Sequence, residues 1–189
     1  MKQCTSSYVG TDNVNGGRKA AEFIKSQLPN GGKIALIGGT PGVTSTDDRI
    51  KGCREGLEGS NIKVVAELSS PGNARDGGVT AMQDILTAHP DINAVFASGD
   101  EPALGAAEAM RAAGIKLEKI VLVGFDGSPN GIASIKAGEL KASIAQFPAQ
   151  MGKLGVLTAA TLARGGKVNP RIDTGVAVIT KENVSEYGD

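Results

Sequence analysis

Hydrophobic positions along the chain fall into short, continuous runs that alternate with longer segments of helical periodicity. The clearest run, residues 120–123, contains four branched apolar residues and no polar one. Such a run is typical of a strand that is buried on both faces of a parallel sheet. In residues 15–28, by contrast, Ala20, Ile24 and Leu28 recur on one side at helical spacing. That spacing indicates a helix with one buried face.

The two patterns alternate along most of the chain. Residues 7–10 are expected to be extended, and Asp100 is expected to cap the helix that follows it. Because a helix follows each strand, the pattern predicts an α/β fold, a doubly wound parallel sheet with helices on both faces in three layers. Predicted strands cover residues 33–38, 62–68, 94–97, 120–125 and 142–146, and predicted helices cover residues 15–28, 47–58, 75–88, 102–113 and 130–137.

The pattern changes after Phe147. Residues 151–163 are predicted to form a helix with one apolar side, and residues 173–179 an extended segment. These elements could extend the same sheet, or they could belong to a second sheet that is largely absent from this chain. An uncovered apolar helix face tends to recruit a partner, so we expect self-association through the segment 148–178.

The amino-acid composition argues against some classes of binding partner. Among 189 residues, 20 basic and 20 acidic side chains cancel, so nucleic acid and anionic membrane are not favoured as partners. Four Phe, two Tyr and no Trp are too few aromatics for a platform on which bases stack. The first seven residues contain no apolar segment, so no signal peptide is expected within this chain.

Catalytic and metal-binding patterns are missing from the sequence. The glycine-rich residues 38–45 follow a strand but lack the Gly-Lys-Ser/Thr of a P-loop and the G-x-G-x-x-G of a dinucleotide fold. No G-x-S-x-G elbow is present, and the one histidine, His89, lies at a predicted helix end. Cys4 and Cys53 have no metal-ligand spacing and are expected to be free thiols. We therefore predict no enzyme, no metal site and no cofactor.

Polar residues at or beyond predicted strand ends make a more coherent set. Asp126 follows the central strand, Arg49 follows the strand 33–38, Gln146 ends the last strand and Asn13 precedes the first helix. Ligands of open α/β sheets bind beyond the carboxyl ends of the strands. A carboxylate and a guanidinium can each hold two hydroxyls, and amides both donate and accept. The set is therefore suited to a polyhydroxylated ligand.

Each of these residues also has a purely structural interpretation. Asp126 sits where it could cap the turn 126–129, and Arg49 could form a surface salt bridge with Asp47 or Asp48. Asn13 could be a helix cap, and Gln146 could be a solvated strand end. The sequence leaves these alternatives open.

Several motifs follow one another along the chain. They are V-G-T-D-N at 9–13, R-I-K-G at 49–52, A-V-F-A-S-G-D-E-P-A-L-G-A at 94–106, V-G-F-D-G at 123–127, A-Q-F-P at 145–148 and I-T-K-E-N-V at 179–184. In this order they resemble the ribose-binding-protein-like family of type I periplasmic sugar-binding proteins. The resemblance runs from about Ser7 to Val184.

The resemblance implies a domain organisation. Family members have two lobes joined by three crossing strands, and this chain would begin near the first crossing. Residues 1–10 would be a hinge lead-in and 11–145 the C-terminal ligand-binding lobe. Residues 146–178 would belong to the N-terminal lobe with its hinge strands, and 179–189 would return to the C-terminal lobe. Roughly a hundred residues of N-terminal lobe would then be absent.

The resemblance also implies which residues contact the ligand. The family's sugar contacts on this lobe fall on Thr11, Asn13, Arg49, Asp126 and Gln146. Two departures leave the identity of the sugar open, and a polyol is a further possibility. Gly99 stands where the family often has Asn, and residues 71–73 replace an aromatic that some members carry.

The resemblance implies a function in uptake. The full-length protein would bind a monosaccharide as the substrate-binding component of an ABC-type sugar uptake transporter. It would act in the periplasm or outside the cell, and its partner would be the membrane permease. The alternative is the inducer-binding core of a lac-repressor-type regulator, which shares the fold. The ending 179–184 and the segment 146–148 favour the transporter, and the chain carries no DNA-binding headpiece.

Overall fold

The apolar runs form the parallel strands of one six-stranded sheet in the computed structural model, which describes residues 5–187. The spatial order is β3-β2-β4-β5-β6-β8, and the first five strands are mutually parallel. These strands agree with the predicted ones to within one residue at each end. They are β2 (Gly32–Gly38), β3 (Ile62–Ser69), β4 (Ala94–Ala97), β5 (Val121–Asp126) and β6 (Ala142–Ala145).

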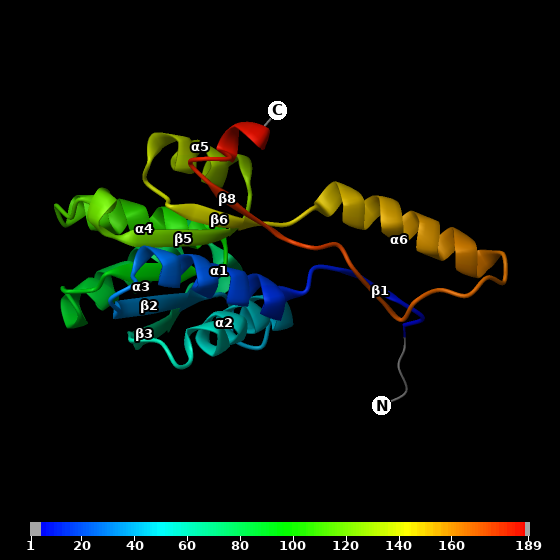
Figure 1. Cartoon of the computed structure of the whole chain (residues 1–189), viewed down its shortest axis with the longest axis horizontal. Helices are drawn as coiled ribbons and strands as arrows, with labels where there is room; N and C mark the ends of the chain where they lie inside the picture. The colour runs from blue at the N-terminus through cyan, green and yellow to red at the C-terminus, as the bar shows by residue number, and fades with distance from the viewer. Residues whose placement is uncertain (1–4, 188–189) are drawn as a thin grey trace.

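Helices cover both faces of this sheet, as Figure 1 shows, so the predicted three-layer fold is confirmed. The alternation of side chains along each strand decides which layer they fill. In β2, Ile34 and Leu36 pack under α1 and α2, whereas Ala35 and Ile37 pack under α3 and α4. The helices are α1 (Asn13–Gln27) and α2 (Thr44–Leu57) on one face, and α3 (Arg75–Ala88), α4 (Asp100–Ala112) and α5 (Pro129–Ala137) on the other.

Glycines bring α1 and α2 into direct backbone contact. A Cβ on Gly17 would lie 2.1 Å from the carbonyl oxygen of Arg49, and a Cβ on Gly52 would lie 2.0 Å from that of Val14. No side chain fits in either place. The close approach holds the start of α1 beside Arg49 on α2, which matters for the site described below.

The segment predicted to be one extended run at 173–179 is split in two. β7 (Arg171–Asp173) pairs in parallel with β1 (Tyr8–Gly10) in a separate two-stranded sheet. β8 (Ala177–Thr180) joins the main sheet, antiparallel to β6. Gly175, with a φ of +75°, lies between them, a backbone conformation that favours glycine. The predicted extended segment is therefore interrupted at Gly175, and its two parts correspond to the two alternatives for this region, a second sheet and the main sheet.

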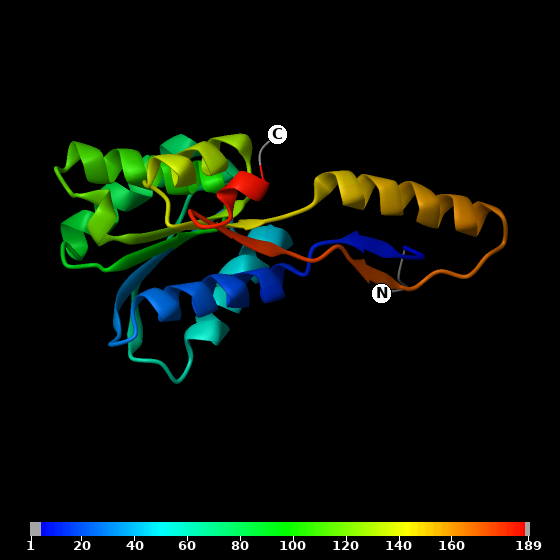
Figure 2. The same cartoon turned by 45° about the horizontal axis from the view of Figure 1, so that its top comes forward.

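β1, β7 and α6 (Pro148–Ala163) form an arm that projects from the main body, as Figures 1 and 2 show from two sides. No residue of α6 is buried, and Val156 and Leu157 are 71% and 53% exposed. In the part of the chain that the structure describes, no helix could cross a membrane.

The exposed α6 predicts self-association at high protein concentration, because burying its apolar side chains against a second copy removes them from water. Sedimentation velocity over a concentration series should reveal dimers or larger species. A monomer at every concentration, with the α6 amides protected from hydrogen exchange, would contradict this prediction.

One of the two cysteines, Cys53, lies in the described part of the chain. Cys53 is a free thiol, fully buried on α2, and its burial raises its pKa to about 12. Such a thiol stays protonated and unreactive at neutral pH. Cys4 lies outside the described residues.

Candidate ligand-binding site

The five residues named as ligand contacts lie together at the carboxyl edge of the sheet. Thr11 Oγ1 donates to Gln146 Oε1 (2.8 Å), and Gln146 Nε2 donates to Asp126 Oδ1 (2.6 Å). Arg49 Nη1 donates to the same Asp126 oxygen (3.1 Å), and Arg49 Nε donates to Asn13 Oδ1 (2.9 Å). We call this hydrogen-bonded set the polar row. Its role in ligand binding stays a prediction.

Arg49 is the centre of the polar row. It is only 6% exposed, and its guanidinium lies 3.9 Å from the centre of the Phe125 ring. Its Nη1 also donates to the main-chain oxygen of Ser98 (2.7 Å). Burial lowers the pKa of Arg49, and the charge of Asp126 acts in the opposite direction. A guanidinium nevertheless keeps its charge at every working pH, so the row contains a buried, fixed cation.

Asp126 faces this cation from the end of β5 in an unusual backbone conformation. Its φ is +111°, which a residue with a side chain adopts at a cost of about 1–3 kcal/mol. Arg49 and Gln146 both bond to Oδ1, whereas no described residue bonds to Oδ2, and the side chain is 36% exposed. Burial raises the pKa of Asp126, with Arg49 and Gln146 opposing that rise. One oxygen is thus held and the other is open to a ligand.

The structure decides most of the alternatives that the sequence leaves open. Asp12, rather than Asn13, caps α1 by accepting from the main-chain N–H of Asn15 (3.0 Å). Arg49 pairs with Asp126 and not with its neighbours on α2. Gln146 is half-buried in the polar row and is not simply a solvated strand end.

The turn after β5 is held by Asp100 and not by Asp126. Asp100 Oδ2 accepts from the main-chain N–H (2.7 Å) and the hydroxyl (2.8 Å) of Ser128, and Oδ1 accepts from the hydroxyl of Ser143 (2.6 Å). The prediction that Asp100 caps its own helix is wrong, because Gly99 is the cap residue and no side chain bonds there. The carboxylate instead lies 1% exposed beneath Gly124 and Gly131.

The buried Asp100 predicts a pH-dependent stability. Burial raises its pKa to about 6, with Ser143 and Ser128 acting in the opposite direction. An unfolded Asp has a pKa of about 3.9, so the native state holds this proton more tightly. The stabilisation is therefore present below pH of about 4 and is lost as the pH rises to about 6, by up to about 3 kcal/mol. The test is to measure the free energy of unfolding in urea, for the unmodified chain and for Asp100→Asn, between pH of about 4 and about 6. A constant difference between the two would contradict the prediction.

Sequence reasoning missed three groups that complete the site. Ser98 contributes a main-chain oxygen, which residue type does not reveal. Phe125 reads as one more apolar residue of a buried strand, yet its ring supports the guanidinium. Asp100 was recognised only as a helix start. The sequence does signal the position of Asp100, because an acidic residue stands between a buried strand and an Ala-rich helix. It gives no signal for the partners of Asp100.

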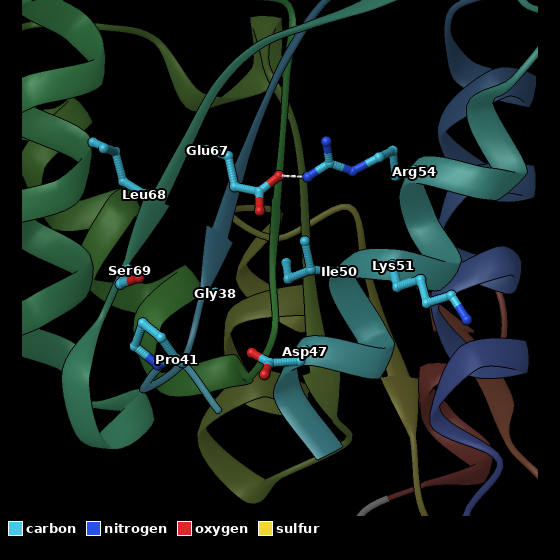
Figure 3. Close-up of a pocket in the computed structure, with 10 residues that line it drawn as sticks. Gly38, Pro41, Asp47, Ile50, Lys51, Arg54, Glu67, Leu68 and Ser69 are labelled. Carbon is cyan, nitrogen blue, oxygen red and sulfur yellow. Dashed lines mark hydrogen bonds and ion pairs between the residues drawn. The ribbon is translucent and has the colours of Figure 1, made fainter. Parts of the chain in front are cut away.

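A separate pocket lies between α2 and the ends of β2 and β3, and none of the five predicted residues lines it. Its volume is about 270 Å³. Figure 3 shows Arg54 and Glu67 reaching toward each other as an ion pair beside Ile50. Both charged side chains are about half exposed, so the pair is a surface salt bridge that contributes little. The polar row is instead an open edge of the sheet.

Comparison with known proteins identifies the family. Residues 2–167 match the family described as "Periplasmic binding protein domain". This chain belongs to that family. The periplasmic binding protein described here is 37% identical over 177 residues to the ribose import binding protein RbsB of Escherichia coli (strain K12). That match covers 93% of this chain but only 58% of the relative, so the chain spans little more than half of the relative's length.

Solved structures agree with this family assignment. An ABC transporter periplasmic solute binding protein from Actinobacillus succinogenes 130z, with bound D-allose, matches with a TM-score of 0.90 and 30% identity. It covers 96% of this chain and 63% of its own. A Caulobacter myo-inositol binding protein bound to myo-inositol matches with a TM-score of 0.90 and 33% identity, over 98% and 64% of the two chains. The predicted family and fold are therefore confirmed for this periplasmic binding protein.

Proposed function

We propose that this chain is the ligand-binding lobe of a sugar-binding protein that serves an ABC-type sugar importer. The observation that carries the proposal is the Arg49–Asp126 pair, which is buried on one side and open on the other. Asp126 Oδ2 and Arg49 Nη2 have no hydrogen-bond partner among residues 5–187. One accepts and the other donates, so together they can hold neighbouring hydroxyls of one ring.

The relatives support a monosaccharide or a cyclic polyol as the ligand. Their names specify ribose import, bound D-allose and bound myo-inositol. These compounds share a small ring that carries several adjacent hydroxyls, and they lack a charged group. A site with two fixed charges and several amides binds such a ligand through many hydrogen bonds, since each hydroxyl both donates and accepts.

The proposal includes a place and a partner. The full-length protein would act in the periplasm or outside the cell and deliver sugar to the membrane permease of the transporter. It would bind and release its ligand without chemistry, needing no cofactor. Residues 11–145 would form the C-terminal lobe, and the arm would belong with the N-terminal lobe. The names of the relatives reported above describe import or solute binding, and they give no support to a repressor core.

Titration of the isotope-labelled chain with D-ribose, D-allose and myo-inositol tests the proposal. At least one sugar should shift the amide resonances of the polar row. Asp126→Ala should weaken that binding at least about tenfold, because a charge-assisted hydrogen bond contributes about 1.5–3 kcal/mol. The melting temperature should also fall, because Asp126→Ala leaves the buried Arg49 guanidinium without its charged partner, so the titration is run well below the melting temperature of the variant.

Asp91→Ala is the matched control. Asp91 is an exposed carboxylate that precedes β4, at the opposite edge of the sheet, and within residues 5–187 its one salt bridge is with Lys33. Its removal should leave sugar binding unchanged. A loss of less than tenfold for Asp126→Ala would remove Asp126 from the site. The absence of any shift with all three sugars would overturn the proposed function.

A further inference from the structure

Asn73 occupies a strained position just beyond β3. It ends the 3₁₀ turn η1 (Pro71–Asn73), with a φ of +54°. Non-glycine residues are uncommon in this left-handed region, although Asn tolerates it better than most. The side chain is half-buried. Because β3 is parallel to β2 and β4, Asn73 lies at the same carboxyl edge of the sheet as Ser98 and Asp126.

The Asn73 amide covers Gly99. A Cβ built on Gly99 would lie 2.1 Å from Asn73 Nδ2, so the amide fills the space that a side chain at position 99 would need. Gly99 itself has an extended backbone, φ −158°, which every residue can adopt. Glycine is therefore required at position 99 by its neighbour and not by its own conformation.

Hydrogen bonds connect Asn73 to the polar row. Ser98 Oγ donates to Asn73 Oδ1 (2.8 Å), and the main-chain oxygen of the same Ser98 accepts from Arg49 Nη1 (2.7 Å). The chain of contacts thus runs from Asn73, through Ser98 and Arg49, to Asp126. The bond from the Ser98 hydroxyl fixes the orientation of the Asn73 amide, because the hydroxyl needs Oδ1 as its acceptor. No residue in 5–187 accepts a hydrogen bond from Asn73 Nδ2.

We propose that Asn73 is a further ligand-contacting residue, which donates from Nδ2 to a hydroxyl of the bound sugar and helps set specificity. The inference rests on the proposed function. The family that the sequence resembles often carries Asn at the position of Gly99. In this chain the amide reaches the same space from position 73, and a glycine at 99 makes room for it. A donor supplied from the β3 side extends the polar row by one strand.

Two single variants test the assignment by sugar titration. Asn73→Asp keeps the shape, the tolerance of positive φ and the acceptor for Ser98, and replaces the Nδ2 donor by a charged carboxylate oxygen that can only accept. It should weaken binding about fivefold to tenfold, which corresponds to one hydrogen bond. Asn73→Gly removes the whole amide and should weaken binding to a similar extent. Because glycine adopts the positive φ without strain, this variant should remain folded.

The swap variant Asn73→Gly/Gly99→Asn separates a ligand contact from a structural role. This variant returns an amide to the vacated space, now from position 99. Its affinity for sugar should be within about threefold of that of the unmodified chain. Gly99→Asn alone places two side chains in one space, so it should lower the melting temperature. Asn73→Gly should lower it less, because this variant creates no clash and loses only the hydrogen bond from Ser98.

The outcomes distinguish this inference from the proposed function. If no sugar shifts any resonance of the polar row, both are overturned. If sugar binding is present and depends on Asp126, but Asn73→Asp and Asn73→Gly bind as the unmodified chain does, only the role of Asn73 is overturned. If Asn73→Asp and Asn73→Gly both weaken sugar binding and the swap variant regains it, the role of Asn73 as a ligand contact is supported.

Discussion

Arg49→Ala should lower the free energy of unfolding by about 3 kcal/mol. The guanidinium is 6% exposed and donates to Asn13 Oδ1, the Ser98 main-chain oxygen and Asp126. Removing one partner of a buried ion pair leaves the other charge uncompensated, which typically costs about 3–5 kcal/mol. We place the expected loss at the lower end, because Asp126 is partly exposed and can be hydrated. The vacated space over Phe125 adds a packing loss.

Arg54→Ala, on the same helix, is the control. Arg54 is 55% exposed and pairs with Glu67 at the surface, so its removal should change stability by no more than about 1 kcal/mol. Arg49→Lys keeps the charge but cannot reach three acceptors in one plane, and it should fall between the two. Urea denaturation followed by circular dichroism measures all three. Equal losses for Arg49→Ala and Arg54→Ala would show that Arg49 is not the centre of the buried network.

The 189-residue chain by itself should bind sugar with a dissociation constant of roughly 1 mM or weaker, equivalent to about −4 kcal/mol. The polar row is an open edge of the sheet, so water competes for each of its hydrogen bonds. Net contributions of about 1 kcal/mol per bond, somewhat more for charged partners, barely exceed the entropy lost on association. The resemblance to the family implies that the ligand is enclosed between two lobes, and this chain covers only 58% of the length of a family relative.

Calorimetry or resonance shifts with a panel of pentoses, hexoses and inositols measure this affinity. Weak binding that still depends on Asp126 would agree with half of a two-lobed site. Micromolar affinity of a monomer would contradict the argument and would mean that the arm, β1, β7 and α6, provides a second wall. The same affinity from a dimer would point to a partner copy as that wall.

The main sheet could be predicted because its strands and helices differ in pattern. Residues 120–123 and 33–38 are apolar without alternation, which is typical of strands between two layers of helices. The C-terminal part could not be predicted in the same way. Short strands such as β7 and β8 carry too few residues for a periodic signal, and their pairing partners, β1 and β6, are remote in sequence.

The sequence predicted the residues of the polar row as ligand contacts, a role that stays a prediction, and it did not predict how these residues are connected. The position of Asp126 after a buried strand, and the resemblance to known motifs, pointed to the five residues of the polar row. Nothing in the sequence showed that Arg49 would use the Ser98 main chain or stack on Phe125. Asp100 was assigned to the wrong partner, because a helix-start aspartate usually bonds within its own helix.

The sequence by itself determined the layered α/β fold and the family, and it predicted the five polar residues as ligand contacts, because periodicity and short motifs are local properties. The tertiary structure decided the rest. It buried Arg49 against Phe125, placed Asp126 at a positive φ with one oxygen open, and brought the Asn73 amide over Gly99. Each of these depends on contacts between residues that are dozens of positions apart. Only the register of the parallel strands and the close approach of α1 and α2 bring such residues within hydrogen-bond distance.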